Sequence, residues 1–307
     1  MTHPVPNGEP EKNKSSTGIE GLVEFEMPRY INGLKVVYYP IIQLRRENEV
    51  DIPEHEIITI DNTDPPQRAL LSSLNVIDRI HRSWYPLLVS KGLRINDRMK
   101  KAYTIAYKNG FTVRPNPEDV FNVFSMPLES IRAVIVGQDP YPGWDQASKR
   151  PKACGYSFAT LSKETPPSLQ RIRTAIANTF GTFTITNKEQ PNNLRGWIDQ
   201  GVFLLNNTPL VFLIGGSESE TECDISPRMR SLLAYPSSVW QGITAAVCKE
   251  INTVNATCPF ILMGREAHYL SRIVAKTVIT SHPSTRSECD FDGKCFTEVP
   301  GINWTQF

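Results

Sequence analysis

The chain has 307 residues, a formal net charge of +1 and a hydrophobic share of 40%. This composition supports a buried core and allows one large domain or two small ones, while the lack of any run of eighteen apolar residues excludes a membrane-spanning helix. The N-terminus lacks a secretory signal pattern, so we expect an intracellular protein. Six cysteines without a Cys-x-x-Cys pair argue against a zinc ribbon or a disulfide scaffold and favour buried free thiols.

The charge is divided unevenly along the chain. Residues 1–67 hold six basic and twelve acidic side chains, whereas residues 68–307 hold 27 basic and 20 acidic ones. We therefore predict an acidic N-terminal leader over 1–67, with its first 20 or so residues disordered because they are rich in Pro, Asn, Lys and Ser. Strand-like segments later in this leader predict a hairpin across Asn32-Gly33. The basic body is compatible with nucleic-acid binding but does not establish it.

After the leader, helical spacing dominates to about residue 110, as in the recurrence of Leu74, Ile77, Ile80 and Trp84. Residues 115–124 predict a turn that leads into a short helix capped near Asn116. From there, short apolar runs that suit strands alternate with segments long enough for helices. This alternation predicts a single α/β domain with a central, mainly parallel four-stranded sheet flanked by helices. The expected strands are 131–136, 201–206, 259–264 and 277–282, and the expected helices include 167–180 and 238–254.

Polar side chains follow three of the predicted strands at the point where each one ends. They are Asp139, Asn206 and His282. Ligands of open α/β sheets bind beyond the carboxyl ends of the strands, so we expect these three side chains to converge there. An ordinary strand-to-loop turn begun by Asp139-Pro140 is the plainer interpretation of the first segment.

Five short motifs in one order carry a family resemblance. They are Gly137–Tyr141 (Gly-Gln-Asp-Pro-Tyr), Gly155–Phe158, Pro166–Ser168, Gly201–Asn206 and His282–Ser284. With these motifs the chain resembles the uracil-DNA glycosylases of the Gly-Gln-Asp-Pro-Tyr type over roughly residues 68–307. The resemblance implies a monofunctional enzyme, without metal or other cofactor, that hydrolyses the bond joining uracil to deoxyribose. Because that bond is inaccessible in a stacked duplex, the uracil nucleotide must be flipped out of single- or double-stranded DNA into a pocket.

The resemblance assigns the chemistry to two residues. Asp139 would position the attacking water and stabilise positive charge that grows on the sugar. His282 would donate a hydrogen bond to the developing uracil anion, for which a neutral imidazole with a fixed tautomer suffices. A lone histidine is more often structural, and it is the ordered set of motifs that favours the catalytic role.

Four further residues would form the uracil pocket. Asn206 offers the donor and the acceptor that match the imide edge of uracil, and Phe158 would stack on the ring. Tyr141 would stand against the 5-position and exclude the methyl group of thymine, while Gln138 would contribute mainly backbone to the wall. Taken singly, Asn206 could be a turn residue and Phe158 a core residue.

The resemblance also implies contacts with DNA. Ser168 and Ser284 would grip phosphates through hydroxyl and backbone groups. Gly264 and Arg265, which follow the third strand, are expected at the DNA as well. Arg286 occupies the position of the family's intercalating leucine, where it would fill the gap left by the flipped base and contact phosphate.

The sequence departs from the family pattern near the catalytic loop. Pro142 stands where the family usually has a histidine, and residues 144–154 form a longer connection that includes the basic run 149–152. That run could touch DNA or could be a solvated loop. Pro142, Arg286 and the closing residues 302–307 are similar to the poxvirus-type branch of the family.

That branch also serves a replicative DNA polymerase as a processivity factor, so a polymerase or accessory factor is an expected partner. No membrane partner is expected. The rival hypothesis is a DNA- or polymerase-binding scaffold with the same fold and reduced catalysis. We expect the protein in the nucleus or, alternatively, at a cytoplasmic site of viral replication.

Overall fold

The structure is a computed structural model that describes residues 79–88, 93, 95–214, 227–284 and 291–307, together with four two-residue strands within the first 42 residues. At its centre four parallel strands pair in the order β12-β11-β6-β9. Each lies where an apolar run predicted it, so the expected fold class is confirmed. Their bounds are β6 (Ala133–Gly137), β9 (Val202–Asn206), β11 (Phe260–Met263) and β12 (Thr277–Thr280).

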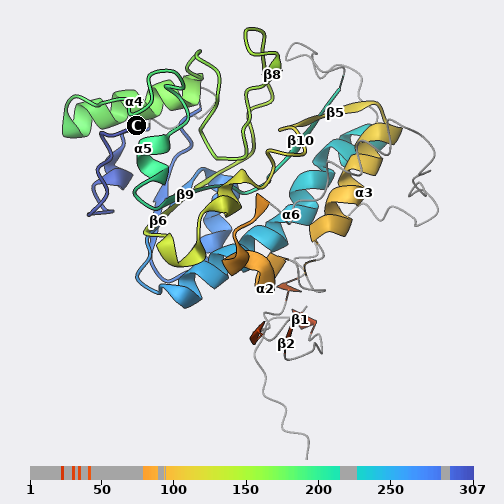
Figure 1. The fold of residues 1–307 in the computed structure, drawn as a ribbon. Coiled ribbons are helices and arrows are strands. Elements are labelled where there is room, and N and C mark those ends of the chain that lie inside the picture. The colour runs from red at the N-terminus through yellow and green to blue at the C-terminus, as the bar shows by residue number, and fades with distance from the viewer. Residues whose placement is uncertain are drawn as a thin grey trace, which may run out of the picture.

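Helices cover both faces of this sheet, so the molecule has three layers (Figure 1). The side chains of β6 alternate between the two faces: Val134 and Val136 pack in one apolar cluster, Ala133 and Ile135 in the other. Both clusters exclude water from β6, which explains why its sequence is an unbroken apolar run.

The first apolar cluster involves α2 (Tyr85–Leu88), α3 (Ile95–Lys108) and α6 (Pro227–Val254). The second involves α4 (Pro167–Phe180) and α5 (Arg195–Ile198). Helix α4 has the predicted bounds. Helix α6 contains the predicted segment 238–254 but begins earlier and continues through Pro236, whose missing amide leaves one carbonyl of the preceding turn without its helical partner.

The short helix expected near Asn116 begins later than predicted. Asn116 instead forms a turn in which its carbonyl accepts a hydrogen bond from the Asp119 amide, and the helix that follows is a 3-10 helix over Asn122–Ser125. The cap prediction was therefore wrong. Further 3-10 helices span Arg82–Trp84, Leu128–Ser130, Arg265–Arg272 and Lys294–Phe296.

Two antiparallel pairs were not predicted. Strand β5 (Phe111–Arg114) pairs with β10 (Val211–Ile214), and β7 (Trp144–Asp145) pairs with β8 (Arg150–Pro151). Strands this short give no clear alternation in the sequence.

In the N-terminal segment β1 (Leu22–Val23) pairs with β4 (Ile41–Ile42), and β2 (Tyr30–Ile31) with β3 (Leu34–Lys35). The second pair confirms the hairpin predicted across Asn32-Gly33. The other expectations for the leader over 1–67 lie outside the described residues.

The last residues of the chain are part of the core. The indole of Trp197 donates a hydrogen bond to the Trp304 carbonyl at 3.0 Å, and the Phe307 amide donates to the Thr184 carbonyl at 2.8 Å. Within the described part of the chain, the cysteines at 154, 248, 258 and 295 are buried and free, as predicted. None of the helices in that part has the length and apolar character needed to cross a bilayer.

Gly155 lies against backbone that leaves no room for a side chain. Its φ is +83°, and an added Cβ would lie 1.8 Å from the Asp119 carbonyl oxygen. Gly110 also has a left-handed φ, of +66°, but a Cβ there would meet nothing within 4 Å. A side chain at Gly110 would meet only the strain of the left-handed backbone, whereas one at Gly155 would meet that strain and an atomic overlap. Comparing the two positions therefore separates the two destabilising effects.

We expect Gly155→Ala to lower the free energy of unfolding by about 3–5 kcal/mol, because strain and overlap add. Gly110→Ala should lower it by only about 1–2 kcal/mol. Urea-induced unfolding of both variants and the wild type measures the difference. Equal losses would show that the backbone at Asp119 moves away at little cost.

Candidate active site

The loops after β6 and β9 are held together at one edge of the sheet. Gly137 and Asn206 are partners in the parallel register, and the Asn207 amide donates to the Gly137 carbonyl at 2.9 Å. One step further, the Thr208 amide donates to the Gln138 carbonyl at 3.0 Å. The backbone of the Gly137–Tyr141 motif is thereby fixed next to Asn206. These are two of the three segments that the sequence predicted to converge.

The third place, His282, reaches the same edge through β11 and β12. The Gly264 amide donates to the Thr280 carbonyl at 2.9 Å, which joins the ends of these strands. Gly264 has a φ of +86°, and an added Cβ would lie 2.9 Å from the Cβ of His282. The structure thus gives Gly264 a definite role, which is to let the His282 side chain approach the end of β11.

His282 is prepared as a hydrogen-bond donor. The Ser284 amide donates to its Nδ1 at 3.1 Å, so in the neutral ring the proton sits on Nε2. Burial lowers the pKa of this imidazole below its ordinary value, which keeps the ring neutral. Its ring centroid lies 5.6 Å from that of Phe158, at an interplanar angle of 41°.

Tyr141 and Phe158 are joined by the backbone of Phe158. The Tyr141 hydroxyl donates to the Phe158 carbonyl at 3.1 Å, and burial raises the pKa of this phenol, which keeps it protonated as a donor. Phe158 has a φ of +61°, which is unfavourable for a residue with a side chain. At Gly137 an added Cβ would come within 3.1 Å of the Phe158 ring. The glycine of the first motif therefore makes room for the phenylalanine of the second.

The neighbouring asparagines Asn206 and Asn207 differ in their bonding. The side chain of Asn206 is nearly buried, and within the described residues it has no hydrogen bond of its own. The side chain of Asn207 donates to the Glu266 carbonyl at 3.2 Å and accepts from the Tyr269 hydroxyl at 2.9 Å. The main-chain carbonyl of Asn207 accepts a hydrogen bond from the Thr244 hydroxyl at 2.9 Å. Asn207, which the sequence did not single out, anchors this turn, whereas no described residue forms a hydrogen bond with the carboxamide of Asn206.

Gln138 and Asp139 are exposed and lie at the border of an open cleft of about 550 Å³. Tyr141, Phe158, Asn206 and His282 do not line this cleft. The loop Gln138–Pro142 therefore faces two neighbouring regions, the predicted pocket residues and the cleft.

The predicted phosphate-binding residues lie on separate elements. Ser168 is half-buried in the first turn of α4, where backbone amides lack helical partners and favour an anion. Ser284 is linked to the same helix, because the guanidinium of Arg171 donates to its carbonyl. Arg265 is exposed at the start of a 3-10 helix, and Arg286 lies outside the described residues. The link through Arg171 had no signal in the sequence.

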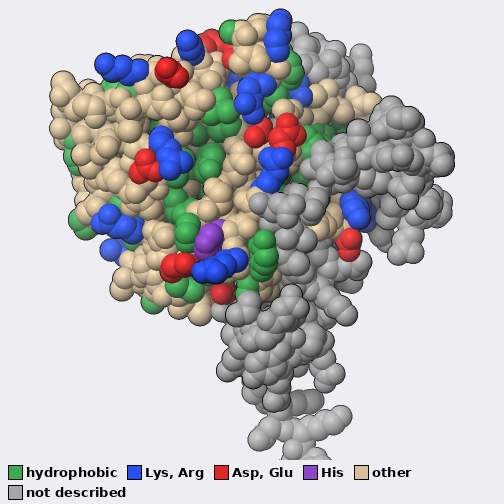
Figure 2. Space-filling model, in the orientation of Figure 1, with side chains coloured by type: hydrophobic (Ala, Val, Ile, Leu, Met, Phe, Trp, Pro, Cys, Tyr) green, Lys and Arg blue, Asp and Glu red, His purple; other side chains and the backbone are tan. Residues whose placement is uncertain are grey.

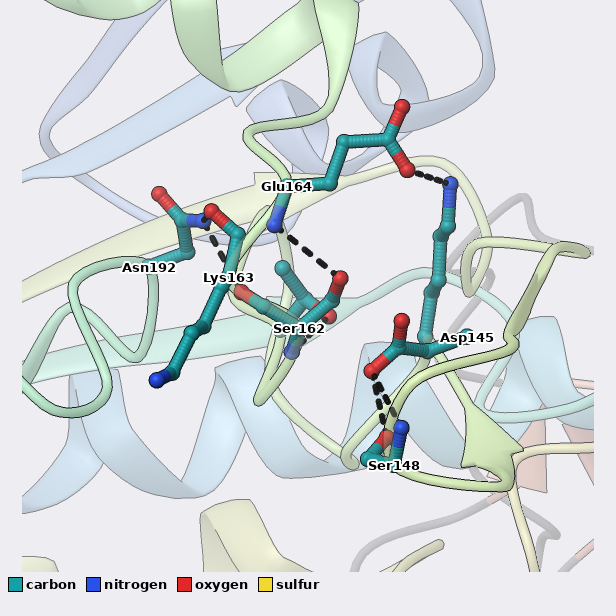
Figure 3. Close-up of polar contacts among 8 residues, drawn as sticks. Asp145, Ser148, Ser162, Lys163, Glu164 and Asn192 are labelled. Carbon is teal, nitrogen blue, oxygen red and sulfur yellow. Dashed lines mark hydrogen bonds and ion pairs between the residues drawn. The ribbon is translucent and has the colours of Figure 1, made fainter.

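The basic run 149–152 belongs to the β7–β8 hairpin, which packs against the body of the protein. Arg150 forms an ion pair with Asp119 at 2.8 Å, and Lys152 forms one with Glu164 at 2.8 Å. Asp145 accepts hydrogen bonds from Ser148 near the tip of the hairpin (Figure 3). Two of its cationic side chains are thus paired within the protein, which favours the solvated-loop interpretation over a free DNA-binding loop.

Charge on the face drawn in Figure 2 is mixed. Basic side chains lie at several separate places, most of them beside acidic ones. The potential of this face therefore does not by itself mark a path for DNA.

Comparison with known proteins gives a consistent picture. No family model matches the chain. A uracil-DNA glycosylase of Blochmanniella floridana is 32% identical over 183 residues, which cover 58% of this chain and 72% of the relative. One from Borreliella burgdorferi is 33% identical over 186 residues, 59% of this chain and 71% of the relative. One from Streptococcus mutans is 28% identical and covers 67% of this chain and 85% of the relative.

The fold has solved counterparts. The crystal structure of mimivirus uracil-DNA glycosylase superposes with a TM-score of 0.54 at 23% identity, covering 71% of this chain and 75% of the other. This likeness supports the fold, and the sequence relatives carry the family assignment. The parallel sheet, the converging motifs and these relatives together lead to one conclusion: the chain belongs to the uracil-DNA glycosylase family, whose members are hydrolytic DNA glycosylases of base excision repair.

Proposed function

We propose that this chain releases uracil from DNA by hydrolysis, with Asp139 and His282 as its catalytic residues. The observation that carries the proposal is the junction at the sheet edge, where Gly137 pairs with Asn206 and Gly264 lets His282 approach. These contacts bring the ends of four strands, distant in sequence, to one side of the sheet.

Asp139 acts at the sugar. Its exposed position suits a carboxylate that must meet water and the sugar of a flipped nucleotide. As the glycosidic bond lengthens, positive charge grows on the sugar, and a fixed carboxylate stabilises that charge more strongly in the transition state than in the substrate.

His282 acts at the base. Its Nε2–H donates to the uracil oxygen on which negative charge develops, and a neutral donor needs no proton transfer to do so. The Ser284 amide fixes the tautomer before the substrate arrives, which is the preorganisation that makes such a donor effective.

The pocket reads the base by shape and hydrogen bonds. The carboxamide of Asn206 is available to the imide edge of uracil, and the ring of Phe158 is available for stacking. Tyr141 excludes a 5-methyl group. The proposed contacts of the DNA strand are Ser168, Gly264, Arg265, Ser284 and Arg286, with Arg286 filling the gap in a duplex.

A role at a replicative polymerase is a separate proposal, which rests on the likeness of Pro142, Arg286 and residues 302–307 to the poxvirus-type branch. Work in the nucleus or at a cytoplasmic viral replication site likewise stays a proposal. The scaffold hypothesis with reduced catalysis is distinguished from the enzyme by assay of single-stranded uracil DNA.

We expect Asp139→Asn and His282→Leu each to slow uracil release by roughly two to three orders of magnitude, because each removes one electrostatic stabilisation of the transition state. Single-turnover rates on a uracil-containing oligonucleotide measure the effect. Asp199→Asn, a change in an exposed ion pair with Arg195 on another part of the fold, serves as the matched control. Rates within threefold of wild type for both catalytic variants would overturn the mechanism.

Tyr141→Ala should release thymine at a measurable rate, because it removes the ring that excludes the methyl group. Tyr141→Phe keeps that ring and loses only the bond to Phe158, so it should not release thymine. Asn206→Asp should release cytosine, because a carboxylate accepts a hydrogen bond from the amino group of cytosine where the carboxamide donates one to uracil. Discrimination by hydrogen bonds is stronger than the exclusion of one methyl group. Base release from matched oligonucleotides tests each variant, after circular dichroism has established that it folds. The assignments fail if neither variant acts on its new base.

The lowered pKa of His282 has a consequence for stability. Its NMR titration midpoint should lie below the ordinary histidine value of about 6.5. The unfolded chain then binds the proton more strongly than the folded protein, so the free energy of unfolding should fall as pH drops from 6.5 towards the folded pKa. Urea unfolding at several pH values should show a smaller fall for His282→Leu. An equal fall in both proteins would assign the effect to other groups.

A further inference from the structure

The open cleft beside the loop Gln138–Pro142 has three walls. One wall is the loop itself, through Gln138, Asp139, Pro140 and Pro142. The second wall is the end of β9 with β10, and the third includes Pro236 and Ser237 of α6 together with Glu266. The hydrogen bond from the Thr208 amide to the Gln138 carbonyl joins the first two walls, so the cleft is a formed part of the site.

The chemistry of this lining suits a nucleobase and does not suit a phosphate. Among the described residues that line the cleft, the charged side chains are those of Asp139 and Glu266, both acidic. A phosphate in contact with two carboxylates would be repelled. The lining is otherwise a mixture of apolar residues from β10 with the polar residues Thr208 and Ser237, which matches the apolar faces and polar edge of a base.

Glu266 provides the most specific contact for such a base. Its backbone carbonyl holds Asn207, which leaves the carboxylate out of that network, and the side chain is exposed at the cleft. A glutamate carboxylate accepts hydrogen bonds from an exocyclic amino group, as it does from the N4 of cytosine. Thymine carries no such group.

We propose that this cleft binds the base of the nucleotide next to the uracil nucleotide in a DNA strand, with a preference for a base that carries an amino group. The proposal rests on the proposed function, because Asp139 is shared between the reacting centre and the cleft. A nucleotide joined to the flipped uridine by one phosphodiester must pass close to the loop Gln138–Pro142. The cleft is a cavity that this loop lines, and its volume of about 550 Å³ falls in the range of sites that hold small ligands.

The test uses single-stranded oligonucleotides with one uracil. The nucleotide on its 5′ side, or on its 3′ side, is cytosine, thymine or an abasic residue. For the wild type we expect kcat/KM to be about tenfold higher with cytosine than with the abasic residue on one of the two sides, in line with the effect of a base that stacks or pairs in a protein site. The proposal is overturned if kcat/KM is the same with cytosine, thymine and the abasic residue on both the 5′ and the 3′ side.

Two variants locate the effect. Ser237→Phe should fill the cleft and remove the advantage of cytosine over the abasic flank, while Ser237→Ala, which leaves the cleft open, should retain it. Glu266→Gln should bring the cytosine-to-thymine ratio of kcat/KM towards one. Glu298→Gln, a change on an exposed residue that does not line the cleft, should leave that ratio unchanged. A ratio that is unaffected by both Ser237→Phe and Glu266→Gln would place any flank preference elsewhere.

The outcome separates this inference from the proposed function. A wild-type protein that releases no uracil from any of these substrates contradicts the function itself. One that releases uracil at rates independent of the flanking base contradicts only the proposed role of the cleft.

Discussion

The site depends on the parallel pairing of β6 with its neighbours. Gly137 lies opposite Asn206, and the pairing continues from Asn207 to Gly137 and from Thr208 to Gln138. The backbone of the loop after β6 is therefore set by hydrogen bonds that extend those of the sheet. A slip of one residue would turn Asn206 to the opposite face and separate it from the loop. The buried apolar clusters on both faces oppose such a slip, because it would move side chains such as Val134 from the cluster on one face of the sheet to the cluster on the other.

Around this junction the motifs constrain one another. Gly137 makes room for Phe158, Tyr141 holds the Phe158 carbonyl, and Gly264 makes room for His282. The rings of Phe158 and His282 lie at 5.6 Å, which brings the second and fifth motifs together. The left-handed backbone at Phe158 is a strained conformation, and these contacts offset its conformational free energy. Strain of this kind is common where a structure fixes a side chain for function.

The central strands and the meeting of their polar ends could be predicted from the sequence, because parallel buried strands leave a continuous apolar run and their carboxyl ends share an edge. The pairing of β5 with β10 could not, since two four-residue strands a hundred residues apart carry no local period. The role of Asn207 was equally hidden: its partners Tyr269 and Thr244 come from other elements, and an asparagine doublet is typical of a turn. The helix near Asn116 was misplaced because a capping residue and a turn residue have the same sequence signature.

The link from Arg171 to Ser284 has a different consequence. The guanidinium of Arg171 holds the main-chain carbonyl at position 284, and any amino acid supplies that carbonyl. The distance between the start of α4 and the loop after β12 is therefore insensitive to which side chain stands at 284. A substitution at position 284 can therefore change the side chain that the loop presents while the carbonyl keeps its bond to the helix. This contact restricts the residue at 171, because a lysine there would offer one point charge in place of a planar fork.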